Sequence, residues 1–227
     1  MYTRLRLGSL VSILIQSAIL SADDLGFGQL KLIDNNLFWV LSRLTIEISN
    51  PLKWYDKVEV ATWPKDVNGL LYLRDFQIKH KGKTIVNATS GWLAVDMESK
   101  RPKNIEISGS DLESFTKLKD VHALRTAPEK LNEVSKGDTF NIIPSYYDLD
   151  INNHVTSSRY IDWMMDTFTP EFHKHSYPRS LSINYLKEIR YGKRLDLLRS
   201  IVSNNEYTFE GIHSNKDSPA FRGKLSF

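Results

Sequence analysis

The chain of 227 residues contains no cysteine. Disulfide bonds, thiolate metal ligands and a cysteine nucleophile are therefore excluded from its chemistry. The absence carries no information about compartment, because a reducing cytosol permits cysteine without requiring it. If the protein is an enzyme, its reaction must run without a thiol of its own.

Long apolar runs are also scarce. The longest, LVSILIQSAIL at residues 10–20, contains Gln16 and two serines. It is shorter than the ~20 residues that a helix needs to span a bilayer. No small-residue cleavage site follows it. We therefore expect no signal peptide, no membrane insertion and a cytoplasmic location.

Neither sign of charge is in large excess. Lysine and arginine number 30 and aspartate and glutamate 27, which gives a net charge of +3 and a pI near 8.9. This balance is compatible with an acidic partner. It is far too weak to indicate nucleic acid, so we expect no nucleic-acid partner.

Complete cofactor and metal motifs are missing as well. GKT from Gly82 lacks the earlier glycine of a phosphate loop, since position 77 is Gln77. GFG at 26–28 lacks the third glycine of a dinucleotide fingerprint, since position 31 is Lys31. HKH at 173–175 has no carboxylate cluster at helical spacing beside it, which favours a solvated loop. We expect no cofactor and no metal ion.

The residues that are present predict a helix followed by strands, twice. Polar positions at spacings of three and four predict a helix over 10–20, and a second helix is expected over 156–168. Runs of β-branched and aromatic residues predict the strands. These are 38–48, 57–63, 70–80, 84–95, 138–149, 180–189, 194–203, 206–213 and 219–227.

A polar stretch separates the two series. Residues 98–135 contain two prolines and one short helical candidate around 112–118, which indicates a linker. We therefore predict an N-terminal unit at 1–100, a linker at 101–135 and a C-terminal unit at 136–227.

The two units look like copies of one another. Residues 44–60 align with 181–197 without a gap, which pairs Leu44 with Leu181 and Ile46 with Ile183. Residues 76–83 likewise align with 209–216. Each match is weak alone, but together with the element order they favour duplication of one unit in which a helix packs against an antiparallel sheet.

Several segments resemble the acyl-acyl carrier protein thioesterases of plastids and bacteria. The resemblance covers nearly the whole chain and includes Trp39, Leu41 and Arg43, the RDF at 74–76, and DLDINNH at 148–154. It implies an α+β double hotdog fold, in which two tandem units each wrap an antiparallel sheet around a long helix. It also implies that the N-terminal unit holds the acyl-chain pocket and that the C-terminal unit is catalytic.

The family's functional residues map onto this sequence residue by residue. The Asp-x-Asn-x-His element implies catalytic roles for Asp150, Asn152 and His154, and the segment NYLKEIRYGKR places the family's glutamate, on the strand after the helix, at Glu188. The cysteine that follows this glutamate in plant members is Ile189 here. The repeat places Pro51 opposite Glu188, so the first unit should be catalytically silent.

These residues suggest how a thioester could be hydrolysed. We expect Glu188 to act as the base on water, with its pKa raised by partial burial beside Leu186 and Ile189. If residues 150–154 are extended, Asn152 and His154 point the same way and can position water and carbonyl. Asp150 would orient that cluster. Unpaired N–H groups at the start of the next helix are further donors.

Each of these motifs also has an ordinary structural explanation. DLDINNH could be an Asx-rich turn that precedes a helix capped by Thr156, and Glu188 could be a surface residue. The basic cluster Lys187, Arg190, Lys193 and Arg194 could be a solvated turn. Its functional interpretation is a carrier-protein-binding patch that attracts an acidic acyl carrier protein.

The resemblance favours a thioesterase that hydrolyses acyl-acyl carrier protein to free fatty acid and terminates fatty acid synthesis. The partner would be an acyl carrier protein with a phosphopantetheine-linked chain. Two alternatives remain, an acyl-CoA thioesterase of the hotdog superfamily and a non-catalytic acyl-chain-binding module. The internal repeat supplies within one chain what single-unit relatives gain by dimerising, so a monomer or a homodimer is expected.

Overall fold

The computed structural model describes residues 3–105, 117–118, 120–214 and 218–227. The chain forms two compact units that do not follow simple sequence halves. The C-terminal unit comprises residues 1–12, 47–55 and 129–227, and the N-terminal unit comprises 13–46 and 56–128. The candidate functional residues named above all lie in the C-terminal unit.

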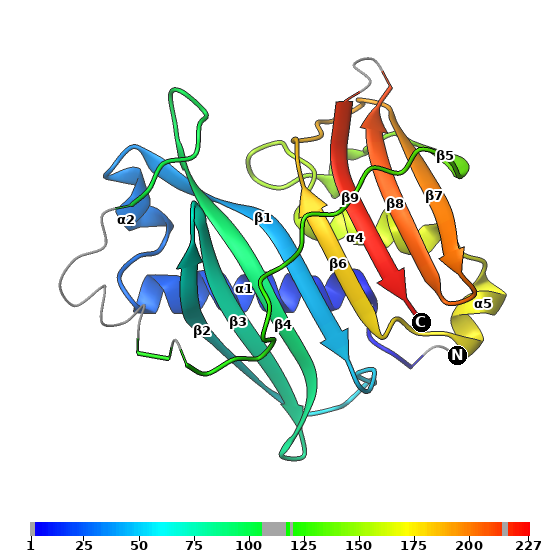
Figure 1. Ribbon diagram of the computed structural model, residues 1–227, viewed down its shortest axis with the longest axis horizontal. Coiled ribbons are helices and arrows are strands. Elements are labelled where there is room, and N and C mark those ends of the chain that lie inside the picture. The colour runs from blue at the N-terminus through cyan, green and yellow to red at the C-terminus, as the bar shows by residue number, and fades with distance from the viewer. Residues whose placement is uncertain (1–2, 106–116, 119, 215–217) are drawn as a thin grey trace. The chain divides into compact units, whose positions relative to one another are not determined.

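The N-terminal unit contains one long helix and the first four strands (Figure 1). Its sheet has the order β2-β3-β4-β1. The helices are α1 at Leu7–Asp24, whose first turns belong to the C-terminal unit, and α2 at Gln29–Ile33. The strands are β1 at Leu37–Ile48, β2 at Val58–Asn68, β3 at Leu71–His80 and β4 at Lys83–Asp96.

The C-terminal unit places helix α4 against the other five strands (Figure 1). Its sheet has the order β6-β9-β8-β7-β5. The strands are β5 at Asp138–Ile142, β6 at Ser180–Tyr185, β7 at Leu195–Ser203, β8 at Glu206–His213 and β9 at Ser218–Ser226. The helices are η1, a 3-10 turn at Tyr146–Asp148, then α4 at Ser157–Asp166 and α5 at Pro170–His175.

The predicted duplication is confirmed in the topology. In each unit the first strand after the long helix lies beside the fourth, which gives β2-β3-β4-β1 in one unit and β7-β8-β9-β6 in the other. The aligned residues also occupy equivalent places, since Phe76 and Phe209 are both fully buried, as are Ile46 and Ile183. One hydrophobic pattern therefore builds both cores.

Helix α1 buries one side, as its residue pattern predicts. Leu10, Leu14 and Ala18 are buried at spacings of four, whereas Ile19 and Leu20 on another side are exposed. Among the described residues, α1 is the one helix that is long and apolar enough to cross a membrane by composition alone. Core helices of soluble proteins meet the same criterion, so this finding is weak evidence for a membrane span.

Some element boundaries differ from the sequence prediction. The strand expected over 138–149 stops at Ile142, because Pro144 follows and η1 then begins at Tyr146. Strand β2 continues past Trp63 to Asn68, and its register shifts between Pro64 and Asp66, so a bulge accommodates the proline. Residues 112–116 of the expected linker helix lie outside the described part of the chain.

The last part of the expected linker is fastened to each unit by buried polar side chains. In the N-terminal unit Asp75 accepts the Ala123 N–H at 2.7 Å, and Lys65 donates to the Leu124 carbonyl. In the C-terminal unit Asn184 accepts the Leu131 N–H at 2.8 Å. Segment 121–134 therefore belongs to the folded structure of both units, because each such bond satisfies a backbone group that would otherwise be buried unpaired.

Candidate active site

The loop that contains the Asp-x-Asn-x-His element is a closed turn. The Oδ1 atom of Asp150 accepts the N–H groups of Asn152 at 2.8 Å and His154 at 3.1 Å. The Asp150 N–H donates to the His154 carbonyl at 2.8 Å, and Asn153 has a φ of 59°. The condition of an extended segment is therefore not met, because the Asp150 carboxylate bonds the local backbone and curls it into an Asx turn.

Glu188 and His154 are in contact, as the sequence analysis required of two parts of one site. Their Oε2 and Nε2 atoms are 3.0 Å apart. Backbone pairing holds them there, since the Val155 N–H donates to the Ile189 carbonyl at 2.9 Å and His154 forms an isolated antiparallel bridge with Arg190. A segment before α4 and a segment after β6 thus form one polar cluster.

The position of Glu188 corrects two expectations. Strand β6 ends at Tyr185, so Glu188 lies in the following loop. The N–H groups of Leu186 and Lys187 both donate to the Ala220 carbonyl, at 2.8 and 2.9 Å, which ends the regular pairing with β9. The Glu188 side chain is 55% exposed, so it is less buried than the sequence analysis expected. Its contact with His154 is what distinguishes it from an ordinary surface glutamate.

The start of α4 is held by a side chain other than the one expected. Thr156 occupies the N-cap position, but its side chain forms no capping hydrogen bond. Its N–H donates to the carbonyl of Asp148, whose carboxylate accepts from Arg159 Nε at 2.6 Å. Burial alone would raise the pKa of Asp148, but hydrogen bonds from Ser145 and Arg159 bring it below its ordinary value. Asp148 thereby fixes the loop and helix that flank the site.

Tyr160, a buried residue of α4, lies beside the site, and the sequence analysis assigned it no functional role. Burial raises the pKa of its hydroxyl, and the negative charges of Glu188 and Asp150 raise it further, while a backbone hydrogen bond with Ile189 opposes them. The ring packs edge-on against Phe221 with a centroid distance of 5.1 Å. The sequence did contain one indication of this position. A tyrosine expected in the core points to a nearby polar group, because a buried hydroxyl group needs a hydrogen-bond partner.

The four basic residues of the expected patch have different surroundings. Arg190 is mostly exposed, and its Nη2 lies 3.9 Å from Glu188 Oε2. Lys187 and Lys193 are exposed. Arg194 donates to Asn141 Oδ1 at 2.6 Å and to Asp196 Oδ1 at 3.3 Å, so it already has partners. All four residues lie in one loop, but they differ in their bonding partners.

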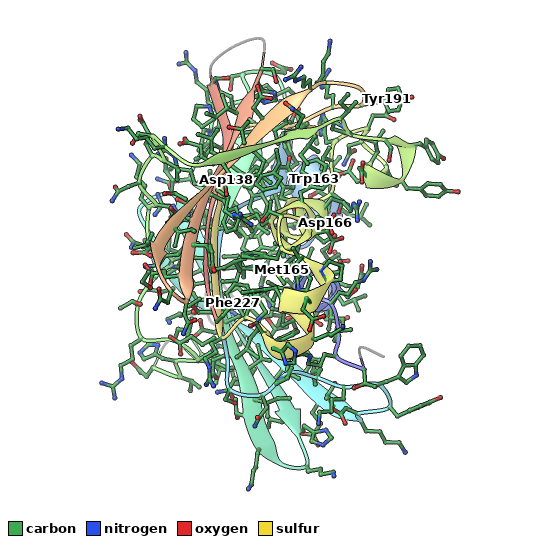
Figure 2. The ribbon with its side chains drawn as sticks, turned by 90° about the vertical axis from the view of Figure 1, so that its right-hand side faces the viewer. Asp138, Trp163, Met165, Asp166, Tyr191 and Phe227 are labelled. Carbon is green, nitrogen blue, oxygen red and sulfur yellow. The ribbon has the colours of Figure 1, made fainter. Side chains whose placement is uncertain are left out.

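A groove of about 510 Å³ opens beside this loop in the C-terminal unit. Its walls come from η1, the turn at Asp150–His154 and the loop after β6. The residues that line it are Tyr146, Leu149, Asn153, Arg190, Tyr191 and Lys193. Figure 2 shows the Tyr191 side chain projecting outward at the edge of the molecule.

The His173–His175 segment is the last part of helix α5, so the expectation of a loop is wrong. His175 Nε2 lies 3.2 Å from Glu171 Oε1, and His173 Nε2 is 3.1 Å from the Met165 carbonyl. Within the described ranges, no group of three or more histidine, aspartate or glutamate side chains is placed to hold a metal ion.

Family models match both parts of the chain. Residues 1–108 match the N-terminal domain of acyl-ACP thioesterase, and residues 131–222 match its C-terminal domain. An acyl-[acyl-carrier-protein] hydrolase of Cuphea viscosissima is 27% identical over 192 residues, 80% of this chain and 45% of the relative. A palmitoyl-acyl carrier protein thioesterase of Arabidopsis thaliana is 25% identical over 78% of this chain and 45% of the relative. The chain thus spans less than half the length of these two plant relatives.

Solved structures give the same result over almost the full chain. An acyl-ACP thioesterase from Bacteroides thetaiotaomicron superposes with a TM-score of 0.85 at 30% identity, covering 99% of this chain and 90% of that one. A 12:0-ACP thioesterase from Umbellularia californica superposes with a TM-score of 0.80 at 18% identity, with the same coverage. The likeness confirms the expected α+β double hotdog fold. With both domain models matched and a solved relative at 30% identity, the chain belongs to the acyl-ACP thioesterase family.

Proposed function

We propose that this protein hydrolyses acyl-acyl carrier protein to a free fatty acid and the carrier protein, and so ends chain elongation. Membership of the family supports the reaction class. The observation that carries the proposal is the 3.0 Å contact between His154 Nε2 and Glu188 Oε2. It joins two residues that are distant in sequence into a pair suited to activating water, and both match the family's motif.

In the proposed reaction, the Glu188 carboxylate accepts a proton from water as the water oxygen attacks the thioester carbonyl carbon. The carbonyl oxygen takes the negative charge of the tetrahedral intermediate. The carbon–sulfur bond then breaks, and the thiolate takes the proton from Glu188. The carboxylate is thereby regenerated, and one water has been consumed for each fatty acid and carrier thiol released.

His154 and Asn152 would position the reacting groups. His154 would position the Glu188 carboxylate, since its Nε2 lies 3.0 Å from Glu188 Oε2. The Asn152 amide is an exposed donor on the adjacent turn and would bond the carbonyl oxygen as charge develops on it. Asp150 acts indirectly in this scheme, since its carboxylate holds the backbone N–H groups of both residues.

The carrier protein would approach over the basic loop. Lys187, Arg190, Lys193 and Arg194 form a positive surface beside Glu188, and an acidic carrier would be attracted to it. Such attraction chiefly accelerates association and weakens as salt is added. We therefore propose an acyl carrier protein as the partner, delivering its chain on a phosphopantetheine arm.

The direct test is Glu188→Gln, which keeps the shape of the side chain and removes its basicity. Hydrolysis of an acyl-carrier thioester should fall by about 10²–10⁴-fold, the usual contribution of a general base, with Tm unchanged. Glu133→Gln, an exposed glutamate of the linker segment, is the matched control. Full turnover by Glu188→Gln would refute the assignment of the base.

Substrate class needs a second comparison. Carrier protein and CoA thioesters of one chain length should differ, with the carrier thioester preferred. Equal or better turnover of the CoA thioester would instead identify an acyl-CoA hydrolase. Acyl-chain binding without release of fatty acid from either substrate would identify a non-catalytic binding module.

A further inference from the structure

Strand β2 is the outermost strand of the sheet in the N-terminal unit, and its first half is a free edge (Figure 1). Residues 58–62 are exposed or half-buried, and their pairing with β3 on the other side is regular. Among the described residues, no backbone–backbone hydrogen bond reaches this stretch from outside the sheet. Such an edge carries a row of unpaired N–H and C=O groups that can bind another strand.

The backbone groups at this free edge belong to alternate residues. In an antiparallel pair every second residue bonds the partner strand, and the residues between turn their N–H and C=O groups the other way. The Lys57 carbonyl lies 3.2 Å from His80 Nδ1, on the side of β3. The odd-numbered residues of 57–61 therefore bond β3, and the even-numbered residues of 58–62 point outward. Pro64 agrees with this alternation, because its missing N–H falls on the outward side, where an edge strand tolerates proline.

The rest of the β2 edge is protected in ways that residues 58–62 are not. A bulge follows Pro64 and interrupts the edge. The segment after residue 120 packs against the strand at the same place, since Trp63 Nε1 donates to the Val121 carbonyl at 3.0 Å. Proteins commonly guard exposed edges with proline, bulges, lysine or a covering loop. The stretch 58–62, with the sequence VEVAT, contains no proline, glycine or lysine.

The side chains of this stretch suit the addition of a further strand. Val60 is aligned with Ile78 of β3, and Thr62 with Phe76, and aligned residues share one face of a sheet. Both β3 residues are fully buried, whereas Val58 is 36% exposed. A strand added at this edge would therefore continue the apolar face of the sheet and cover Val58.

The edge is complementary to itself in one antiparallel register. With a two-fold axis at Val58, this residue of each copy would form a hydrogen-bonded pair with its equivalent. Lys57 of each copy would then lie directly opposite Glu59 of the other. Both side chains are exposed, and opposite charges across an antiparallel pair stabilise it. An axis at Glu59 would instead place two carboxylates opposite each other, which is unfavourable.

We propose that this edge is a homodimer interface, in which residues 57–60 of two copies of the chain pair as antiparallel strands about a two-fold axis at Val58. A second copy is the occupant because the edge matches itself in charge and in hydrogen bonding. The contact closes at a dimer, since a two-fold axis uses the same surface of both copies. The paired stretch is short, so association is weak and depends on concentration.

The test is sedimentation equilibrium of charge variants over a wide range of protein concentration. The wild-type mass should rise with concentration from 26.2 kDa toward twice that value. Glu59→Lys places lysines opposite each other and should raise the dissociation constant roughly 10–30-fold. The double variant Lys57→Glu/Glu59→Lys restores opposite charges and should recover the wild-type value. Glu98→Lys, at an exposed glutamate elsewhere in the unit, is the matched control and should behave as the wild type.

A pair of proline variants tests the backbone contact separately. Val60→Pro removes an N–H that points outward, so it should abolish the dimer while the chain stays folded by circular dichroism. Ala61→Pro removes an N–H that bonds β3, so it should lower Tm clearly. The same Tm loss in both variants would contradict the assignment of outward and inward residues.

Four results of the mass measurements would overturn the interface. A mass of 26.2 kDa at every concentration would show that the edge does not pair. A dimer that survives both Glu59→Lys and Val60→Pro would have its contact elsewhere. Masses that rise beyond the dimer would show open-ended association, and a charge-swapped double variant that stays monomeric would refute the register. None of these results depends on thioester hydrolysis, so the interface and the proposed function stand or fail separately.

Discussion

Replacing Asp75 with alanine should destabilise the protein severely, because it leaves a buried lysine without its anionic partner. Asp75 is fully buried on β3 and Lys65 on β2 is 4% exposed, and their charged atoms are 3.2 Å apart. The same carboxylate accepts hydrogen bonds from Thr89 Oγ1 at 2.5 Å and from the Ala123 N–H at 2.7 Å. The substitution therefore removes one member of a buried ion pair and two further hydrogen bonds.

The expected loss of stability follows from the charge of Lys65, which stays buried after the substitution. Breaking a buried ion pair by deleting one partner costs about 3–5 kcal/mol, since the other charge stays desolvated. Total stabilities of domains are only about 5–15 kcal/mol. For a chain of this size each kcal/mol lowers Tm by roughly 2–4 °C, so Asp75→Ala should lower Tm by about 6–20 °C.

Thermal and urea unfolding of three variants would test this reasoning. Asp75→Ala should show the loss, and Lys65→Met/Asp75→Leu should recover part of it by removing the orphaned cation. Glu171→Ala, which breaks an exposed pair with Lys174, should leave Tm nearly unchanged. The reasoning is wrong if Asp75→Ala resembles the Glu171 control, or if the double variant is no more stable than Asp75→Ala.

Three further substitutions test separate features. The pKa of Asp148 is lowered on folding, so its stabilising effect is full above its ordinary value of 3.8 and is lost as pH falls through the lower folded value. The stability gap between wild type and Asp148→Asn in urea should therefore narrow from pH 6 to pH 3, and a constant gap would contradict the ionic role. A Cβ at Gly137 would lie 2.2 Å from the Arg199 carbonyl oxygen, so Gly137→Ala should cost about 1–3 kcal/mol, and an unchanged urea midpoint would count against this contact. Burial lowers the pKa of Arg74 to about 10, and its Nη2 has no hydrogen-bond partner among the described residues. Its Nη1 donates to Ser21 Oγ at 3.0 Å and to Thr62 Oγ1 at 3.2 Å. Arg74→Met should unfold at the same or a higher temperature, because it removes a desolvated charge, and a clear drop in Tm would show that these two bonds outweigh the desolvation.

The sequence predicted the sheet well because each strand carries a strong local pattern. Alternate apolar residues are buried at aligned positions in the two units, and their alignment needs no knowledge of contacts. The aligned pairs are Leu44 with Leu181, Ile46 with Ile183 and Phe76 with Phe209. Helices α2 and α5 escaped prediction because they are short and have few buried residues. Their existence depends on neighbouring elements more than on periodicity.

The catalytic roles of the candidate residues stay a prediction, and the geometry of the site differs from the one expected. The resemblance supplied Asp150, Asn152, His154 and Glu188, and the structure brings His154 and Glu188 into contact. The conformation of the loop depends on Asp150 bonding its own backbone, which a pattern of alternating polar residues does not reveal. The burial of Tyr160 beside the charges of Glu188 and Asp150 is a property of the fold that its place on a helix does not reveal.

The C-terminal unit is built from three separate segments of the chain, and this limits how the protein can be recombined with its relatives. That unit takes residues 1–12 and 47–55 along with 129–227, and the Ile48 N–H bonds the Arg179 carbonyl at 2.7 Å. A chimera joined only within the linker would exchange the proposed catalytic loops without the two early segments that complete their unit. The two units therefore cannot be exchanged between relatives as continuous halves of the sequence. A viable exchange of the C-terminal unit must move its three stretches of sequence together.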